Sequence, residues 1–444
     1  MRTRSVIGRR GLAVDGRGIV RSLLIAGLML ATTLPSARAQ DGSGAVSFMF
    51  FGDPAELAAY QGLVSAFEAE HPAIDIELIH IPSLIDYQAR LGADLAAGSQ
   101  ADVVLINYRR YAPLAARGVL EPLAPYLRSS RVISDVDFYP QAIDPFRWRG
   151  QLMCLPQNIS SLVVYYNKDL FDAAGLDHPA EDWTWDEFLA AAQALTLDRD
   201  GDGITDQYGL GTDASLYRVA PFIWQNGGEL VVTEANGTPL RLALDSRAAR
   251  DAIEWFVALQ TEHGVVPDAL AEQAESSESR FIAGRTAMFL NSRRGVPTYR
   301  RIDRFDWDVA PLPRGEQAAG ILHTDVYCMA AAAEDKDAAW TFIEFANSPQ
   351  GQSIVARSGR TVPSLMEVAQ STAFLDPAAK PASSSVFLDT IPLLRAVPVT
   401  AAWVEVEELA GDELERAFYG VAPVDEVIEA MIVRTLPFFA EEGG

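Results

Sequence analysis

The sequence contains few of the residues on which most catalytic and metal centres depend. Of its 444 residues only two are cysteine and five are histidine. The histidines, His71, His80, His178, His263 and His323, are scattered and show no zinc-ligand spacing. The sequence has neither a G-x-S-x-G nucleophile turn nor a phosphate-binding P-loop. No catalytic apparatus is recognisable from these residues, although paired carboxylates for glycoside hydrolysis stay an open alternative in so acidic a chain.

Basic residues are also scarce relative to acidic ones. The 36 Lys and Arg stand against 60 Asp and Glu, which gives a formal net charge of −24. Such a surface repels nucleic acid and anionic membranes, so neither is expected as a partner. A chain of 444 residues with 49% hydrophobic content is long enough for two lobes.

Only the N-terminal segment has the pattern of a targeting sequence. Arginines between Arg2 and Arg21 precede an apolar run at 22–34, and Ala37-Arg38-Ala39 offers a cleavage site. The run is short for a transmembrane helix, so residues 1–39 are expected to be a signal peptide. No cysteine stands at the cleavage site to carry a lipid. We expect a soluble periplasmic protein.

Two alternatives remain open for this segment. It could persist as an uncleaved anchor, and the pair Arg9-Arg10 in "GRRGLAV" leaves export by the general or the twin-arginine route undecided.

The two cysteines, Cys154 and Cys328, leave a second choice. In an oxidising compartment they would form one disulfide, and otherwise they are two buried thiols.

The first third of the mature chain alternates strand and helix patterns. Residues 45–51 and 73–81 predict strands, residues 54–72 and 87–98 predict helices, and the apolar run at 101–107 is typical of a buried parallel strand. Asp53 is placed to cap the first helix, with Pro54 at its first position. This order predicts an α/β lobe.

One acidic loop, "LDRDGDGITDQYG" at 197–209, has most of the pattern of a calcium loop. Its candidate ligands are Asp198, Asp200, Asp202, the Ile204 carbonyl and Asp206, with Gly203 at the turn. Gly209 stands where such a loop usually has glutamate. The alternative is a loop braced by carboxylates that accept hydrogen bonds from their own backbone. Calcium, if bound, would be structural, and no other cofactor is required.

Aromatic and amide side chains recur where strands are predicted to end. They are Phe51, Tyr108, Tyr111, Gln157, Asn158, Trp224, Gln225, Asn226 and Trp403. Aromatic faces stack on sugar rings, and planar polar groups bind hydroxyls. Open α/β sheets bind ligands at the carboxyl ends of their strands. The pattern favours a sugar site.

A series of motifs in a fixed order resembles a known family. They are "LVSAFEAEHPAIDIELIHIP", "LGADLAAGSQADVVLIN", "LEPLAPYL", "LPQNISSLVVYYNKDLF", "WTWDEFLAAAQALT", "DGDGITDQYGL", "WQNGGEL", "FIAGRTAMFLNS", "APLPRG", "KDAAWTFIEFANSPQGQ" and "GRTVPS". The chain is similar over nearly its whole mature length to the extracellular solute-binding proteins of carbohydrate ABC importers, the group that includes maltose-binding protein.

The resemblance implies a fold and a function. The fold would be an α/β periplasmic binding protein fold, with 40–157 and 327–372 in the N-terminal lobe and 158–326 and 373–444 in the C-terminal lobe. A carbohydrate would be captured between the lobes and delivered to the membrane permease, without catalysis. We expect a monomer. A receptor for an acidic or phosphorylated polyol is the alternative within binding, and a secreted glycan-processing enzyme with two paired carboxyls is the rival from another class.

The resemblance also nominates ligand contacts. They are Phe51, Asp53 and Glu56; Asn107, Tyr108, Arg109 and Arg110; Gln157, Asn158 and Ser160; Trp224 and Asn226; Asn291 and Arg293; His323 and Asp325; and Trp403, expected to stack on the sugar. Two features stand apart. The pairs Arg109-Arg110 and Arg293-Arg294 would suit an anionic solute or lie exposed on the surface. Cys154 and Cys328 would lie in neighbouring crossing strands, which favours the disulfide. The acidic loop would be remote from the cleft.

Overall fold

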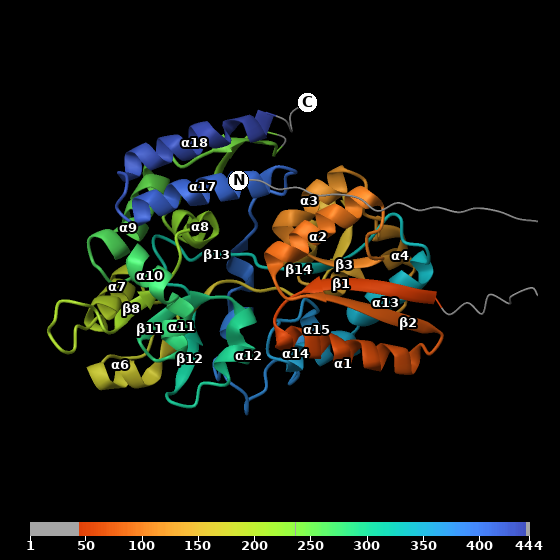
Figure 1. Ribbon diagram of the computed structural model, residues 1–444, viewed down its shortest axis with the longest axis horizontal. Helices are drawn as coiled ribbons and strands as arrows, with labels where there is room; N and C mark the ends of the chain where they lie inside the picture. The colour runs from red at the N-terminus through yellow and green to blue at the C-terminus, as the bar shows by residue number, and fades with distance from the viewer. Residues whose placement is uncertain (1–43, 236, 441–444) are drawn as a thin grey trace, which may run out of the picture. The chain divides into compact units, whose positions relative to one another are not determined.

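The chain folds into an assembly of helices and two main sheets (Figure 1), described here from a computed structural model for residues 44–235 and 237–440. The expected signal peptide, 1–39, lies outside the described residues. Across 44–235 and 237–440, each helix is either too short or too polar to cross a bilayer.

The first sheet has five strands in the order β2 (Ile74–Ile81), β1 (Gly44–Phe51), β3 (Val103–Asn107), β14 (Asp325–Met329) and β6 (Cys154–Pro156). The strands β1, β2 and β3 are parallel, and β14 runs antiparallel to both β3 and β6. Helices α1 (Pro54–Glu70), α13 (Lys336–Ala346) and α14 (Pro349–Arg357) pack beside this sheet (Figure 1). The predicted α/β order is confirmed, with α1 and β1 close to their expected bounds.

Helix α1 begins as the sequence predicts. The Asp53 carboxylate accepts hydrogen bonds from the backbone N–H groups of Ala55, at 2.8 Å, and Glu56, at 3.1 Å. Pro54 occupies the first turn, where its missing N–H costs nothing. This cap fixes the direction of α1 directly after the strand end at Phe51, and it brings Glu56 to the same edge of the sheet.

The second sheet has four strands in the order β12 (Trp307–Ala310), β7 (Val163–Asn167), β11 (Thr286–Asn291) and β8 (Tyr208–Gly211). Helices α8 (Leu216–Gln225), α9 (Arg247–Thr261), α17 (Trp403–Phe418) and α18 (Val424–Ala440) pack against one another, with α17 and α18 side by side (Figure 1). Their apolar faces are buried: Phe222, Phe256 and Phe418 are inaccessible to solvent. Burial on this scale is the main stabilising term of such a lobe.

The remaining elements are shorter or more peripheral. The helices are α2 (Leu84–Ala97), α3 (Tyr108–Ala116), α4 (Ala124–Ser129), α5 (Pro140–Ile143), α6 (Lys168–Ala174), α7 (Trp185–Ala194), α10 (Ala269–Ala274), α11 (Ser277–Ile282), α12 (Val296–Tyr299), α15 (Met366–Ala369) and α16 (Val386–Asp389), with the 3₁₀ turns η1 (Asp135–Asp137), η2 (Asp144–Phe146), η3 (Arg293–Gly295) and η4 (Ile391–Leu393). The strands are β4 (Arg147–Trp148), β5 (Gln151–Leu152), β9 (Val231–Thr233), β10 (Pro239–Leu242), β13 (Gly320–Ile321) and β15 (Leu394–Arg395).

Two crossing segments join the sheets. Residues 157–162 connect β6 to β7, and residues 322–324 connect β13 to β14. The two segments pair where Ser160 and His323 exchange backbone hydrogen bonds of 2.7 and 2.8 Å. Residues 360–363 lie against them, since the Ile159 N–H donates to the Val362 carbonyl at 2.9 Å.

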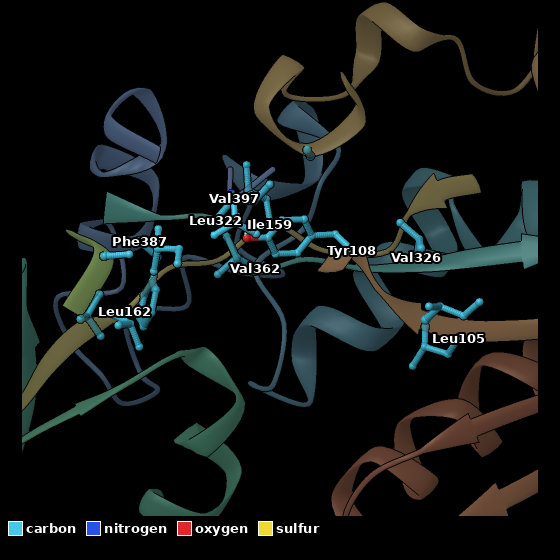
Figure 2. Packing of buried hydrophobic residues seen from close by; sticks show 14 of the residues in the cluster. Leu105, Tyr108, Ile159, Leu162, Leu322, Val326, Val362, Phe387 and Val397 are labelled. Atoms are coloured by element: carbon cyan, nitrogen blue, oxygen red, sulfur yellow. Dashed lines mark hydrogen bonds between the residues drawn. The ribbon is translucent and has the colours of Figure 1, made fainter. Parts of the chain in front are cut away.

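The crossing segments lie in a continuous buried cluster that includes Ile159, Leu322 and Val362 (Figure 2). All three side chains are almost inaccessible to solvent. The last strand to join the first sheet, β14, begins at Asp325. The residue-level lobe limits stay a prediction.

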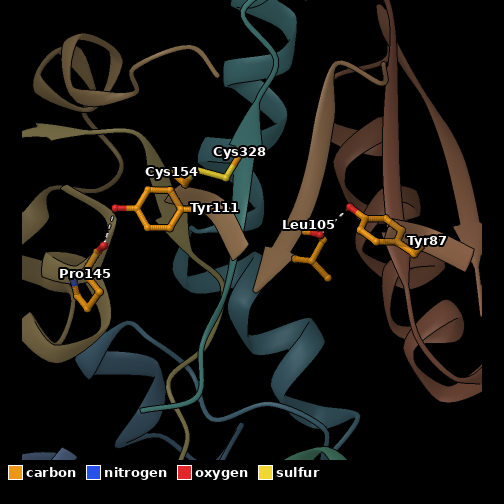
Figure 3. Close-up of a disulfide and its surroundings, with 6 residues drawn as sticks. All are labelled: Tyr87, Leu105, Tyr111, Pro145, Cys154 and Cys328. Carbon is orange, nitrogen blue, oxygen red and sulfur yellow. Dashed lines mark hydrogen bonds between the residues drawn. A yellow bond between two sulfur atoms is a disulfide. The ribbon is translucent and has the colours of Figure 1, made fainter. Parts of the chain in front are cut away.

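A disulfide joins Cys154 of β6 to Cys328 of β14 (Figure 3). The two residues stand directly opposite in the antiparallel pairing, with Cα atoms 4.5 Å apart. That separation is typical of a non-hydrogen-bonded antiparallel pair, which suits a cross-strand bridge. The choice left open by counting cysteines is thus decided for the disulfide.

Candidate functional site

A cavity lies where the ends of β1, β3, β11 and β14 meet the crossing segments. Eleven of the expected ligand residues line it: Phe51, Glu56, Asn107, Arg109, Arg110, Asn158, Ser160, Asn291, Arg293, His323 and Asp325. These residues are far apart in sequence, and strand ends and crossings bring them together, as the rule for open α/β sheets requires. Whether they bind a ligand stays a prediction.

Six expected residues do not line this cavity, and three of them belong to the first lobe. Asp53 caps α1 and pairs with Arg360 at 3.1 Å. Tyr108 is fully buried (Figure 2), and its hydroxyl accepts from the Val397 N–H at 3.5 Å. Gln157 is also buried, and its Nε2 donates to the Tyr60 hydroxyl at 2.7 Å. These three side chains bond to neighbouring parts of the protein instead of lining the cavity.

The other three are Trp224, Asn226 and Trp403. Trp403 is fully buried at the start of α17, so its ring has no exposed face on which a sugar could stack. Trp224 is buried on α8 with the Arg395 guanidinium over its ring at 4.8 Å. Asn226 donates to the Ala248 carbonyl at 2.8 Å. The expected stacking role of Trp403 is therefore wrong for this structure, because helix packing consumes the ring.

Nine lining residues were absent from the expected set: Leu84, Tyr217, Arg218, Ser292, Arg294, Thr324, Arg360, Thr361 and Val362. Tyr217 and Arg218 occupy the first turn of α8, soon after β8 ends. The strand-end rule that nominated Phe51 applies to them equally. Arg360 and Thr361 belong to the motif "GRTVPS", for which the family resemblance implies no ligand contact.

Two further tyrosines, Tyr87 of α2 and Tyr111 of α3, support the structure without lining the cavity. Tyr111 donates its hydroxyl hydrogen to the Pro145 carbonyl at 2.7 Å, and Tyr87 donates to the Leu105 carbonyl at 2.7 Å (Figure 3). Both rings are buried. A position near a strand end therefore does not show whether an aromatic ring faces the cavity or packs in the core.

We call the first side of the cavity the balanced wall; it comprises Glu56, Asp325 and Arg360 with the amides Asn107 and Asn158. Arg360 pairs with the Glu56 carboxylate at 2.5 Å. Burial raises the pKa of Glu56 to about 8, against the lowering effect of Arg360. The Asp325 carboxylate accepts from Asn107 Nδ2 at 3.1 Å and from Asn158 Nδ2 at 3.5 Å. Acids, amides and one guanidinium here offer both donors and acceptors.

We call the second side the basic wall; it comprises Arg218, Arg293 and Arg294. Arg218 Nε donates to Asp213 at 2.7 Å, whereas its buried Nη1 has no hydrogen-bond partner among the described residues. Arg293 is only 1% exposed; its Nε donates to the Gly359 carbonyl at 2.8 Å and its Nη1 to Ser384 Oγ at 3.0 Å. Burial lowers the pKa of Arg293 to about 9, which still leaves it charged at neutral pH.

Arg294 and His323 complete the surroundings of the basic wall. Arg294 is exposed and forms no ion pair within the described part of the chain. Burial lowers the pKa of His323 well below its usual range, and Arg109, Arg218 and Arg294 lower it further, so the imidazole is neutral. Its buried Nε2 also lacks a hydrogen-bond partner among the described residues.

The Tyr217 ring holds neighbouring side chains of the cavity in place. The guanidinium carbons of Arg109 and Arg218 lie 4.7 and 5.1 Å from the centre of its ring, and the His323 ring centre lies 5.8 Å away. Cation–π contacts of this kind hold guanidinium planes in place. The ring therefore positions two arginines and a histidine around one corner of the cavity.

The acidic loop lies apart from the residues that line the cavity. Carboxylate oxygens of Asp198, Asp200 and Asp206 come within 4.8 Å of one another. The Asp202 carboxylate is not in that group and accepts from the Ile204 N–H at 2.8 Å. Asp198 accepts from two backbone N–H groups of its own loop, which lower its pKa. The loop thus has both the hydrogen bonds that brace its turn and a cluster of three carboxylates. Calcium binding by this loop stays a prediction.

Two lobes bridged by crossing segments, with a polar cavity at the strand ends, define a protein of the solute-binding class. The family model described as bacterial extracellular solute-binding protein matches residues 52–353. The chain belongs to that family. Membership in a family of solute-binding proteins agrees with the expectation of a non-enzymatic protein. The role of this cavity stays a prediction.

Individual relatives agree with this assignment. A putative binding protein of Brucella abortus is 25% identical over 419 residues, covering 91% of this chain and 95% of the relative. A mannitol-binding protein of Pseudomonas aeruginosa is 26% identical over 316 residues, covering 68% of each chain. An ABC substrate-binding protein of Listeria monocytogenes, solved with cycloalternan, has a TM-score of 0.81 at 22% identity, covering 90% of this chain and 99% of that one. The expected two-lobed periplasmic binding protein fold is confirmed.

Proposed function

We propose that this protein is the periplasmic receptor of an ABC importer, which captures a carbohydrate or related polyhydroxylated solute and hands it to a membrane permease. One observation carries the proposal. Residues from both sheets and from the crossing segments line a single cavity rich in planar hydrogen-bonding groups. Hydroxyl-rich solutes are bound by such groups, because amides, carboxylates and guanidinium groups each engage two hydroxyls at once.

The position of the cavity suits capture by closure. Phe51, Asn107 and Asp325 come from the first sheet, whereas Asn291 and Arg218 come from the second sheet and α8. A solute that contacts both sides binds the closed arrangement better than the open one, so it shifts the population toward closure. The closed form is the one that a permease would recognise. The mannitol and cycloalternan relatives support a polyhydroxylated ligand.

Export, oligomeric state and calcium belong to the same proposal. The signal-peptide pattern at 1–39 supports export to the periplasm, with loss of that segment. The mature protein acts as a monomer that meets its permease transiently. The Asp198, Asp200 and Asp206 cluster binds structural calcium, which fastens a loop away from the cavity.

Thermal unfolding against a panel of solutes tests the proposal. Neutral hexoses, oligosaccharides, polyols, sugar acids and sugar phosphates are each added to the purified mature chain. A solute at 100 times its Kd adds about 2.7 kcal/mol to the free energy of unfolding, a rise of roughly 3 °C in Tm for a chain of this size. The stabilising solute is then recovered and identified by chromatography.

The outcomes separate the functions. A stabilising solute that is recovered intact supports the receptor. Conversion of that solute into a product would support the rival glycan-processing enzyme. If no member of the panel changes the melting temperature, a carbohydrate receptor is contradicted, even though the family assignment stands.

A further inference from the structure

The basic wall and its surroundings carry more positive charge than the fold requires. We propose that the ligand is a polyhydroxylated solute with one anionic group, a carboxylate or a phosphate, which binds at Arg218, Arg294 and His323 while its hydroxyl groups face the balanced wall. This inference rests on the proposed function and specifies the class of solute.

The arginines of the cavity fall into two groups when their partners are compared. Arg109 and Arg110 pair with Glu407 and Glu408 of α17, and Arg360 pairs with Glu56 and Asp53. Those three charges are compensated within the protein. In the basic wall, Arg218 has one carboxylate partner, whereas Arg293 and Arg294 have none among the described residues. The uncompensated charge is therefore concentrated on one side of the cavity.

Arg218 supplies the most specific indication. Its side chain is 9% exposed, and Nε donates to Asp213, yet the buried Nη1 has no partner among the described residues. A buried donor of a charged group without an acceptor is destabilising, so such atoms are rare unless a ligand completes them. Because Arg218 lines the cavity, a ligand oxygen is the natural acceptor.

His323 gives a second, independent indication at the same corner. Its buried Nε2 also lacks a partner, and its ring lies beside the Tyr217 ring that holds Arg218. Burial, and after it the charges of Arg109, Arg218 and Arg294, lower the pKa of this imidazole and keep it neutral. A neutral imidazole can donate one hydrogen bond to a ligand oxygen without adding another charge. Two unpartnered polar atoms and an unpaired arginine thus belong to residues that line the same cavity, with both arginines close enough to act on the imidazole.

The balanced wall is suited to the other end of the same solute. Asp325, Asn107 and Asn158 already share hydrogen bonds. The Asn107 amide is fully engaged by Thr324, Asp325 and Arg109, whereas the Asp325 carboxylate and the Asn158 side-chain oxygen can still accept from a hydroxyl group. An anionic group placed there would meet the Asp325 carboxylate, which would repel it. The orientation of the solute follows: its anionic group lies toward the basic wall and its hydroxyl groups lie toward the balanced wall.

Calorimetric titration with matched solutes tests this inference. D-glucose is compared with D-glucuronate and D-glucose 6-phosphate, D-galactose with D-galacturonate and D-galactose 6-phosphate, and D-mannitol with D-mannitol 1-phosphate. We expect an acidic member to bind at least roughly 10-fold more tightly than its neutral counterpart, as a charge-assisted hydrogen bond allows. The uronate and phosphate arms distinguish a carboxylate ligand from a phosphate ligand.

A substitution then locates the anionic group. Arg294→Gln removes an exposed, unpaired charge and should weaken binding of the acidic solute roughly 10- to 100-fold, with little change for its neutral counterpart. Arg247→Gln is the matched control, because that α9 side chain is 94% exposed, does not line the cavity, and changes the net charge equally. The control should bind as the unaltered protein does.

Each outcome decides. Tighter binding of an acidic member, lost in Arg294→Gln alone, supports the inference. A neutral solute that binds as tightly as its acidic counterparts overturns it and leaves the proposed function intact. Equal losses in Arg294→Gln and Arg247→Gln would show a general charge effect and also overturn it. If no solute of either kind binds, the inference fails, whereas the proposed function is decided by the wider thermal panel.

Discussion

The two walls of the cavity use similar residues in opposite ways. In the balanced wall, Arg360 is enclosed by the carboxylates of Glu56 and Asp53. In the basic wall, Arg293 is more deeply buried but is held by a carbonyl, a hydroxyl and two aromatic rings. The first arrangement cancels charge inside the protein, and the second leaves charge for a ligand to compensate. The difference teaches that counting arginines around a site is less informative than counting their partners.

The substitution Arg360→Gln disrupts the balanced wall and should cause the largest loss of stability among these variants. It leaves the buried Glu56 carboxyl without its cation, at a cost of about 3–5 kcal/mol when that group is ionised. Burial raises the pKa of Glu56 from 4.5 to about 8. Protonation of Glu56 in the folded state therefore adds stability that is fully present below pH 4.5 and is lost as the pH rises through 8.

The destabilisation by Arg360→Gln should therefore grow between pH 5 and pH 9. Urea unfolding at both pH values measures it. The double variant Glu56→Gln, Arg360→Gln is the control and should show a much weaker dependence on pH. A loss for Arg360→Gln that is the same at pH 5 and pH 9 would mean that Glu56 is not the group left unpaired.

The adjacent arginines of the basic wall should separate stability from binding. Arg293→Ala removes two hydrogen bonds and the contacts with Phe374 and Phe387, so we expect a loss of about 2–4 kcal/mol. Arg294→Ala should change stability by less than about 0.5 kcal/mol, because the side chain is exposed and unpaired among the described residues. Chemical unfolding of the two variants decides; equal losses would contradict the assigned roles.

The disulfide marks a further difference between the two sheets, because both cysteines lie in the first one. The double variant Cys154→Ala, Cys328→Ala should lose about 2–4 kcal/mol, because the bridge closes a loop across 174 positions. Scanning calorimetry of this variant, and of the unaltered protein with and without reductant, measures the loss. If reductant lowers the melting temperature of the double variant as well, the effect does not come from this bridge.

Calcium should give the smallest effect, away from both walls. At 1 mM it should add about 1 kcal/mol to stability if the loop binds as extracellular modules do. Asp200→Asn should abolish the rise in melting temperature, whereas Asp202→Asn, outside the carboxylate cluster, should reduce it less. A melting temperature that does not respond to calcium or to chelator would leave the loop braced by its own hydrogen bonds.

The sequence was most informative where local pattern determines structure. The apolar strands and the Asp53 cap appeared as expected, because side-chain periodicity and capping are short-range properties. It was least informative about which aromatic rings stay accessible. Trp403 and Trp224 look like Phe51 in sequence, yet helix packing buries the first two. That distinction depends on tertiary contacts that no local pattern encodes.

The missed site residues have a related cause. Tyr217 and Arg218 follow β8 as Phe51 ends β1, so the strand-end rule could have nominated them. Arg360 could not be found in this way, since it reaches the cavity from the loop after α14 and is fixed by Glu56 of a distant helix. Partner assignments of this kind require the fold.

The most direct test of the account titrates one solute into variants of both walls. The solute that stabilises the protein most in the thermal panel is titrated into the unaltered protein, Asp325→Asn and Arg294→Gln by calorimetry. We predict that each substitution weakens binding by roughly 10-fold or more, because the solute contacts both walls at once. Binding that is unchanged in both variants would contradict the central claim and place the ligand outside this cavity.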